Sequence, residues 1–99
     1  MTIQETVNGD TIQLAVEGSV DINTAPELQA KILSCFQQAK NVILDFGGVD
    51  YLSSAGLRAL MLGQKTAMSK NGTMKMMNVQ APIMQVLSMT GFSGILTFI

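Results

Sequence analysis

Two adjacent serines, Ser53 and Ser54, are the residues of this sequence whose type and position most clearly suggest chemistry. They directly follow the run Val49–Leu52 and stand at the start of a helical pattern. The first turn of a helix has unpaired N–H groups and a partial positive charge, which together favour a phosphate group. A serine at this position can also simply cap the helix. Because one serine is enough for a cap, both interpretations of the pair stay open, as a cap and as a phosphate-accepting hydroxyl.

A second polar segment, Ser19–Thr24, also lies between a strand pattern and a helix pattern. In open α/β sheets, binding residues gather where strands end and helices begin. The topology therefore predicts that this segment lies beside the one that contains Ser53 and Ser54. Asp21 and Asp50 would then make the shared site more negative.

The chain lacks the residue sets of most enzymes. It contains no histidine, so it has neither a Ser-His-Asp or Cys-His pair nor a histidine metal ligand. Its only cysteine, Cys35, falls on the apolar stripe of a helix, which predicts a small core residue. The seven carboxylates show no paired acid/base spacing, and Gly47-Gly48 is no phosphate-binding fingerprint. We therefore expect no independent catalytic activity, no metal and no cofactor.

The composition is typical of one small domain with a large apolar core. Of 99 residues, 47% are hydrophobic and 13% are charged, and the formal net charge is -1. That balance argues against binding to the phosphate backbone of a nucleic acid or to an anionic membrane surface. The most apolar stretch, residues 81–99, is too interrupted to span a membrane. A single cysteine and no secretory leader predict a cytoplasmic protein.

The elements in the N-terminal half follow from hydrophobic spacing. Strand patterns at Thr2–Val7 and Thr11–Glu17 flank Asn8-Gly9, a strong hairpin signal. A helix is predicted from an N-cap at Thr24, with Glu27 at capping-box spacing, to about residue 39. The apolar run at 41–46 predicts a central strand covered on both faces.

The C-terminal half continues the alternation of helices and strands. The helix after the two serines is expected to end at Asn71-Gly72, and a strand is predicted at Thr73–Val79. A short helix from Ala81 to about Thr90 and a final strand at Gly94–Ile99 complete the chain. The order β-β-α-β-α-β-α-β predicts an α/β domain with a mixed sheet, parallel except for the first hairpin.

Several segments together resemble one protein family. Val49-Asp50-Tyr51-Leu52-Ser53-Ser54-Ala55-Gly56-Leu57 resembles the signature loop of STAS-domain anti-sigma factor antagonists. Residues 16–21 with Thr24 resemble the family's first loop, Val42–Asp45 its central strand, and residues 81–92 its closing helix and turn. The resemblance covers nearly the whole chain, which implies one STAS domain over residues 1–99.

The resemblance implies a role in bacterial signal transduction and transcription regulation through partner switching. The unphosphorylated antagonist binds an anti-sigma factor, a serine kinase with the ATP-binding fold of histidine kinases, and so releases a sigma factor. Phosphorylation of a serine in the signature loop reverses the binding, and a serine phosphatase restores it. STAS domains also serve as accessory subunits on the ATPase of lipid-transport ABC complexes, which is the alternative function.

The resemblance also implies site residues. Family members commonly have Asp-Ser-Ser-Gly, with the phosphorylated serine directly before the glycine, whereas Ala55 occupies that position here. This departure makes Ser54 the predicted phosphorylation site and Ser53 the reserve candidate. The predicted partner-binding residues are those of the two loops and the helix start: Asp21, Thr24, Asp50, Ser53, Ser54, Gly56, Leu57 and Arg58.

Methionine is unusually frequent, with eight in the chain and seven of them from Met61 onward. Methionine packs well into irregular core gaps, which explains most of them. Alternatively, Met61, Met68 or Met89 lines an adaptable docking face, and the sequence leaves both interpretations open. The absence of a heptad seam predicts a monomer.

Overall fold

The structure, a computed structural model, describes all 99 residues, Met1–Ile99. Five strands and three helices follow one another as the sequence predicts, with one added 3-10 turn near the end. In chain order they are β1 (Thr2–Asn8), β2 (Thr11–Val20), α1 (Ala25–Phe36), β3 (Asn41–Leu52), α2 (Ser54–Ser69), β4 (Thr73–Met77), α3 (Ala81–Met89), the 3-10 turn (Phe92–Gly94) and β5 (Thr97–Phe98).

The strands form one mixed sheet in the order β1-β2-β3-β4-β5, and only the β1–β2 pair is antiparallel. This confirms the predicted α/β topology. The hairpin turn differs by one residue from the prediction, because Asn8 pairs with Thr11 and the turn residues are Gly9 and Asp10. Gly9 has a φ of +62°, so the residue that tolerates positive φ stands first in the turn, as in type II′ hairpins.

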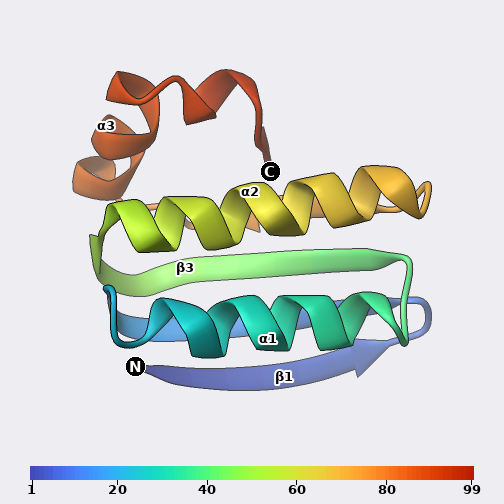
Figure 1. Ribbon diagram of the computed structural model, residues 1–99. Coiled ribbons are helices and arrows are strands. Elements are labelled where there is room, and N and C mark those ends of the chain that lie inside the picture. The colour runs from blue at the N-terminus through green and yellow to red at the C-terminus, as the bar shows by residue number, and fades with distance from the viewer.

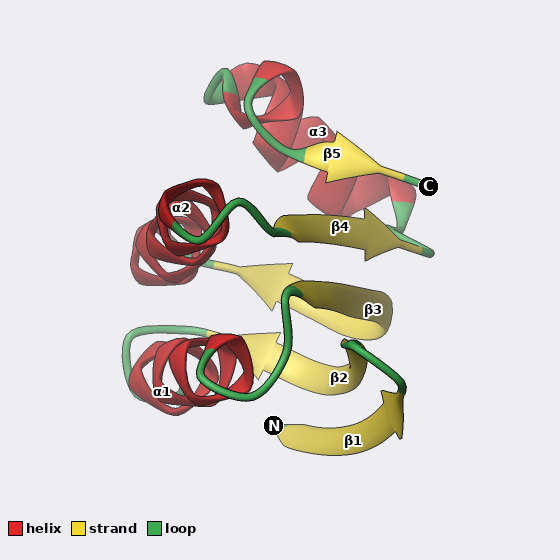
Figure 2. Ribbon diagram, turned by 90° about the vertical axis from the view of Figure 1, so that its right-hand side faces the viewer, coloured by secondary structure: helices red, strands yellow, loops and turns green.

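Helices α1 and α2 lie side by side on the same face of the sheet (Figures 1 and 2). Under them, alternate residues of the three central strands are fully buried, among them Leu14, Leu44 and Met76. Their neighbours Ala15, Ile43 and Met77 point to the opposite face and are only partly buried. The prediction that the central strand is covered on both faces is therefore wrong, because neither α1 nor α2 reaches that second face. Leu87 of α3 belongs to the same core, at the β4–β5 end of the sheet.

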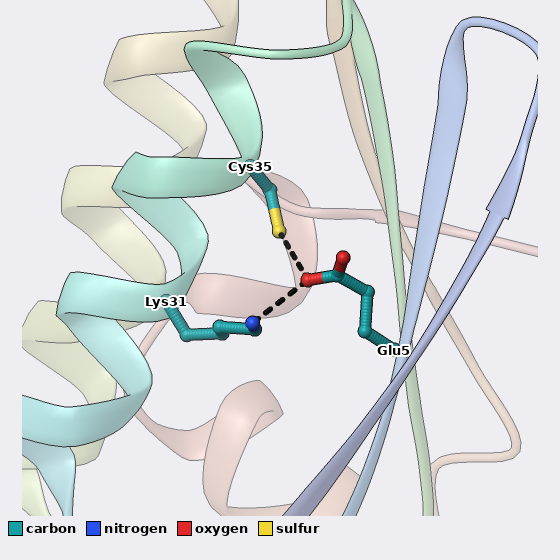
Figure 3. Close-up of polar contacts among 3 residues, drawn as sticks. All are labelled: Glu5, Lys31 and Cys35. Atoms are coloured by element: carbon teal, nitrogen blue, oxygen red, sulfur yellow. Dashed lines mark hydrogen bonds and ion pairs between the residues drawn. The ribbon is translucent and has the colours of Figure 1, made fainter.

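The edge strand β1 is held to α1 by a polar contact (Figure 3). The Lys31 ammonium lies 2.8 Å from Glu5 Oε1, and the hydrogen bond from this pair raises the pKa of Lys31. The Cys35 thiol points to the same carboxylate oxygen at 3.9 Å. Only 1% of Cys35 is exposed, which confirms the predicted core position, and burial raises the pKa of its thiol.

The ends of several elements differ from those that the apolar pattern predicts. Helix α1 ends at Phe36, three residues before the expected end, and β3 runs on past Gly47-Gly48 to Leu52. Strand β4 ends at Met77 because the next residue, Asn78, has a φ of +58°. At the end of α2, Asn71 takes the left-handed conformation with a φ of +57°.

The methionines divide between core and surface. Met74 and Met76 are buried in β4, whereas Met68 and Met89 are 67% and 80% exposed. Core filling therefore explains the first pair and leaves the second pair on the surface. As for membranes, none of the helices combines the length and the apolar character that crossing one requires.

Candidate functional site

The two polar segments singled out in the sequence lie side by side. Parallel strands β2 and β3 end at the same edge of the sheet, where α1 and α2 both begin, at the left of Figure 1. The backbone N–H of Ser53 donates to the carbonyl of Val20 over 2.9 Å. The Ser19 hydroxyl donates to the Asp50 carboxylate over 3.0 Å. The predicted juxtaposition of the loops is thus confirmed, and Asp50 is one of the groups that maintain it.

The loop before α1 is fixed by a reciprocal pair of hydrogen bonds. The Asp21 carboxylate accepts from the backbone N–H of Thr24 over 3.0 Å, and the Thr24 hydroxyl accepts from the backbone N–H of Asp21 over 2.8 Å. This is the geometry of a capping box. The predicted box between Thr24 and Glu27 is wrong, because the Thr24 hydroxyl makes no hydrogen bond that caps α1. It accepts from the backbone N–H of Asp21 and donates to the carbonyl of Ser19 instead.

Hydrogen bonds to the Asp21 carboxylate stabilise its ionised form. The backbone N–H of Thr24, followed by that of Asn23, lowers the pKa of Asp21 below its ordinary value of 3.8. The negative charge of Asp21 is therefore fixed at neutral pH and used inside its own loop. Its first role in the structure is to hold the loop beside the start of α2.

The two serines have different environments. The Ser53 hydroxyl is the N-cap of α2 and accepts from the backbone N–H of Gly56 over 3.3 Å. Ser54 is the first residue of the helix, is exposed, and its hydroxyl makes no hydrogen bond. The capping interpretation is therefore confirmed for Ser53, and Ser54 is the serine whose hydroxyl is free.

Two of the predicted partner-binding residues lie in the interior. Leu57 is only 8% exposed and belongs to the hydrophobic core, so most of its side chain is already covered within the domain. Its contact with a partner stays a prediction. Gly56 is also buried, and a Cβ there would lie 2.5 Å from Leu52 Cδ1 and 2.9 Å from Val20 Cγ1. A glycine at this position lets α2 begin close against the ends of β2 and β3. Both residues therefore act on the site by positioning the start of α2 against the sheet.

A groove of about 440 Å³ lies between α1 and α2, next to Ser54. Its lining is mostly apolar and includes Ile22, Leu33 and Ala55, with Arg58 as its only charged residue. Ile22 is 73% exposed, and Tyr51, near the end of β3, is 53% exposed. Neither residue is predicted as part of the site from the sequence, although an isoleucine between Asp21 and Asn23 is unusual in a polar loop.

The amino-acid sequence was compared with models of known protein families. A family model described as "Mlab, STAS domain" matches residues 3–97, nearly the whole chain. The chain belongs to the STAS domain family. The membership confirms the resemblance drawn from the signature loop.

Individual relatives of this STAS domain carry the name of anti-sigma factor antagonists. The anti-sigma-B factor antagonist of Bacillus subtilis (strain 168) is 25% identical over 89 residues, which cover 90% of this chain and 82% of that protein. BtrV of Bordetella bronchiseptica (strain ATCC BAA-588 / NCTC 13252 / RB50), named as a candidate anti-sigma factor antagonist, is 30% identical over 81 residues. That match covers 81% of this chain and 70% of BtrV.

Solved structures of relatives share the fold. The unphosphorylated form of the anti-sigma factor antagonist SpoIIAA matches with a TM-score of 0.78 at 17% identity, over 99% of this chain and 87% of that one. The phosphorylated form of SpoIIAA, a Bacillus cell fate determinant, matches with a TM-score of 0.77 at 18% identity, over 99% and 91%. The present fold is thus equally similar to both forms of that protein.

Proposed function

We propose that this STAS domain is an anti-sigma factor antagonist that acts by partner switching. Its unphosphorylated form would bind an anti-sigma factor that is also a serine kinase, and phosphorylation of Ser54 would end that binding. A serine phosphatase would restore it. The observation that carries the proposal is the free, exposed hydroxyl of Ser54 at the junction of two interlocked loops, in a chain whose relatives carry that function in their names.

The local structure suits a switch by charge. A phosphate adds about -1.5 to -2 charges at neutral pH, and the first turn of α2 offers N–H groups that tolerate it. Ser53 already caps the helix through its own hydroxyl, so modification of Ser54 breaks no hydrogen bond of the fold. A partner packed on this edge, by contrast, would have to bury the new charge. An unpaired buried charge costs several kcal/mol, enough to weaken binding by a factor of about a hundred or more.

The same geometry supports a binding role without catalysis. The polar groups of the loops, Asp21, Thr24 and Asp50, are engaged in hydrogen bonds that hold the loops together. We propose that the protein acts in the cytoplasm as a regulatory subunit.

Two measurements test the proposal. In the first, each anti-sigma factor kinase of the same organism is purified and titrated with the chain by calorimetry, and one of them should bind. In the second, that kinase and ATP are added, and mass spectrometry locates the phosphate. Phosphate on Ser54, lost in Ser54→Ala and kept in Ser53→Ala, is the expected result.

Other outcomes would redirect the assignment. Phosphate on Ser53, or phosphate that persists in Ser54→Ala, would move the regulated site to the reserve candidate. Absence of binding to every such kinase, together with binding to the ATPase of a lipid-transport complex, would replace the proposed function by the alternative one.

A further inference from the structure

Arg58 has no partner within the chain. The only ion pair of the structure joins Lys31 to Glu5, on the far side of α1, and Arg58 makes no side-chain hydrogen bond. The Arg58 side chain is exposed, yet it lines the α1–α2 groove among apolar residues. An arginine beside an apolar surface favours a partner that supplies a carboxylate or a phosphate there.

Resting on the proposed function, we propose that the α1–α2 groove binds an apolar side chain of the anti-sigma factor while a neighbouring carboxylate of that partner pairs with Arg58. The lining of the groove matches such an occupant. Ile22, Leu33 and Ala55 are apolar, and Arg58 is the one cation among the lining residues. The groove is also continuous with the loops that carry Ser54, since Ile22 belongs to one loop and Ala55 follows Ser54 directly.

In this proposal, a phosphate on Ser54 pairs with Arg58 in place of the partner's carboxylate. Ser54 and Arg58 are four residues apart in α2, so their side chains lie on the same face of the helix, one turn from each other. A guanidinium group binds a phosphate through paired hydrogen bonds, and the intrachain phosphate is always within reach. The partner carboxylate then faces the phosphate without its cation. Phosphorylation thus weakens binding in two ways, by adding a charge and by occupying Arg58.

The phosphate half of the proposal is tested on the isolated protein. Phosphoserine is incorporated at position 54 during translation, and the second phosphate pKa is measured by phosphorus NMR. Arg58→Ala should raise that pKa by about 0.5 unit, because it removes a neighbouring cation. Lys65→Ala is the matched control: it removes a positive charge from the same helix, about 16 Å from Ser54 along the axis, and should leave the pKa unchanged. An equal phosphate pKa in the wild type and in Arg58→Ala overturns this half.

The partner half is tested with the anti-sigma factor kinase that binds in the calorimetric titration. Arg58→Ala and Ile22→Ser change exposed residues and should keep the fold, as circular dichroism will show. Each should weaken binding of the unphosphorylated chain by about tenfold or more, with Lys65→Ala unchanged. Phosphorylation should also weaken binding by a smaller factor in Arg58→Ala than in the wild type, because part of its effect acts through Arg58.

The two tests separate the inference from the proposed function. Wild-type affinity in both variants, or an equal effect of phosphorylation with and without Arg58, overturns the groove and the competition while the partner-switching function stands. If no kinase binds, the proposed function and the partner half fail together, and the phosphate pKa still decides whether Arg58 binds a phosphate on Ser54.

Discussion

Substitution by alanine should destabilise the fold at Ser53 and leave its stability nearly unchanged at Ser54. Ser53→Ala removes the N-cap hydroxyl that accepts from the Gly56 N–H over 3.3 Å. Loss of a serine cap costs about 0.5–2 kcal/mol, and this bond is longer than the usual distance of about 3.0 Å, so we expect about 0.5–1 kcal/mol. In a domain of this size, that loss lowers the midpoint of thermal unfolding by about 2–8 °C.

Ser54→Ala is the matched control. The Ser54 hydroxyl makes no hydrogen bond and the residue is exposed in a helix, where alanine has the higher propensity. Its free energy of unfolding should therefore stay within about 0.5 kcal/mol of the wild type. Urea denaturation and thermal melts of the two variants measure both quantities. Equal stability of the two variants, or a larger loss in Ser54→Ala, would refute the assignment of the cap to Ser53.

Three further predictions concern the core, the first loop and assembly. Leu57→Ala should lower the free energy of unfolding by about 2–3 kcal/mol in urea titrations, because Leu57 is 8% exposed. Leu57→Met should cost less than about 1.5 kcal/mol. A loss of partner binding with unchanged stability would contradict the burial of Leu57. The lowered pKa of Asp21 contributes stability above its ordinary value of 3.8 that is lost as the pH falls through the folded-state pKa, so the stability difference between wild type and Asp21→Asn should shrink in acid melts. A difference independent of pH would contradict the assigned hydrogen bonds. Sedimentation at micromolar concentration should show a monomer, and a tight dimer would contradict that expectation.

Much of the fold is encoded in local pattern. Alternating apolar residues in β2, the turn glycine of the first hairpin and the caps of α2 each predict an element at nearly its observed place. The parallel order of β2 and β3 follows from the helix that connects them, and it places the two loops side by side, as the Ser19–Asp50 hydrogen bond shows. The elements could be predicted because each depends on neighbours in the sequence, and the pairing of β2 with β3 because a helix that connects two strands favours a parallel pair.

The errors arise where tertiary packing decides. Ile43 looks like part of a continuous buried run, but it lies on the sheet face that neither α1 nor α2 covers, and an apolar residue there is indistinguishable in sequence from a buried one. Thr24 matches two capping boxes, and the competing hydrogen bond to Asp21 determines which one forms. Leu57 lies on the apolar stripe of its helix and also in the signature loop. Its burial is the position that the apolar stripe predicts, and its contact with a partner stays a prediction.

The central claim is most directly tested by the dissociation constant of the chain and its anti-sigma factor kinase, measured with serine and with phosphoserine at position 54. The account predicts that phosphorylation weakens binding by about a hundredfold or more, while circular dichroism shows the same fold in both forms. Equal dissociation constants for the two forms would contradict it.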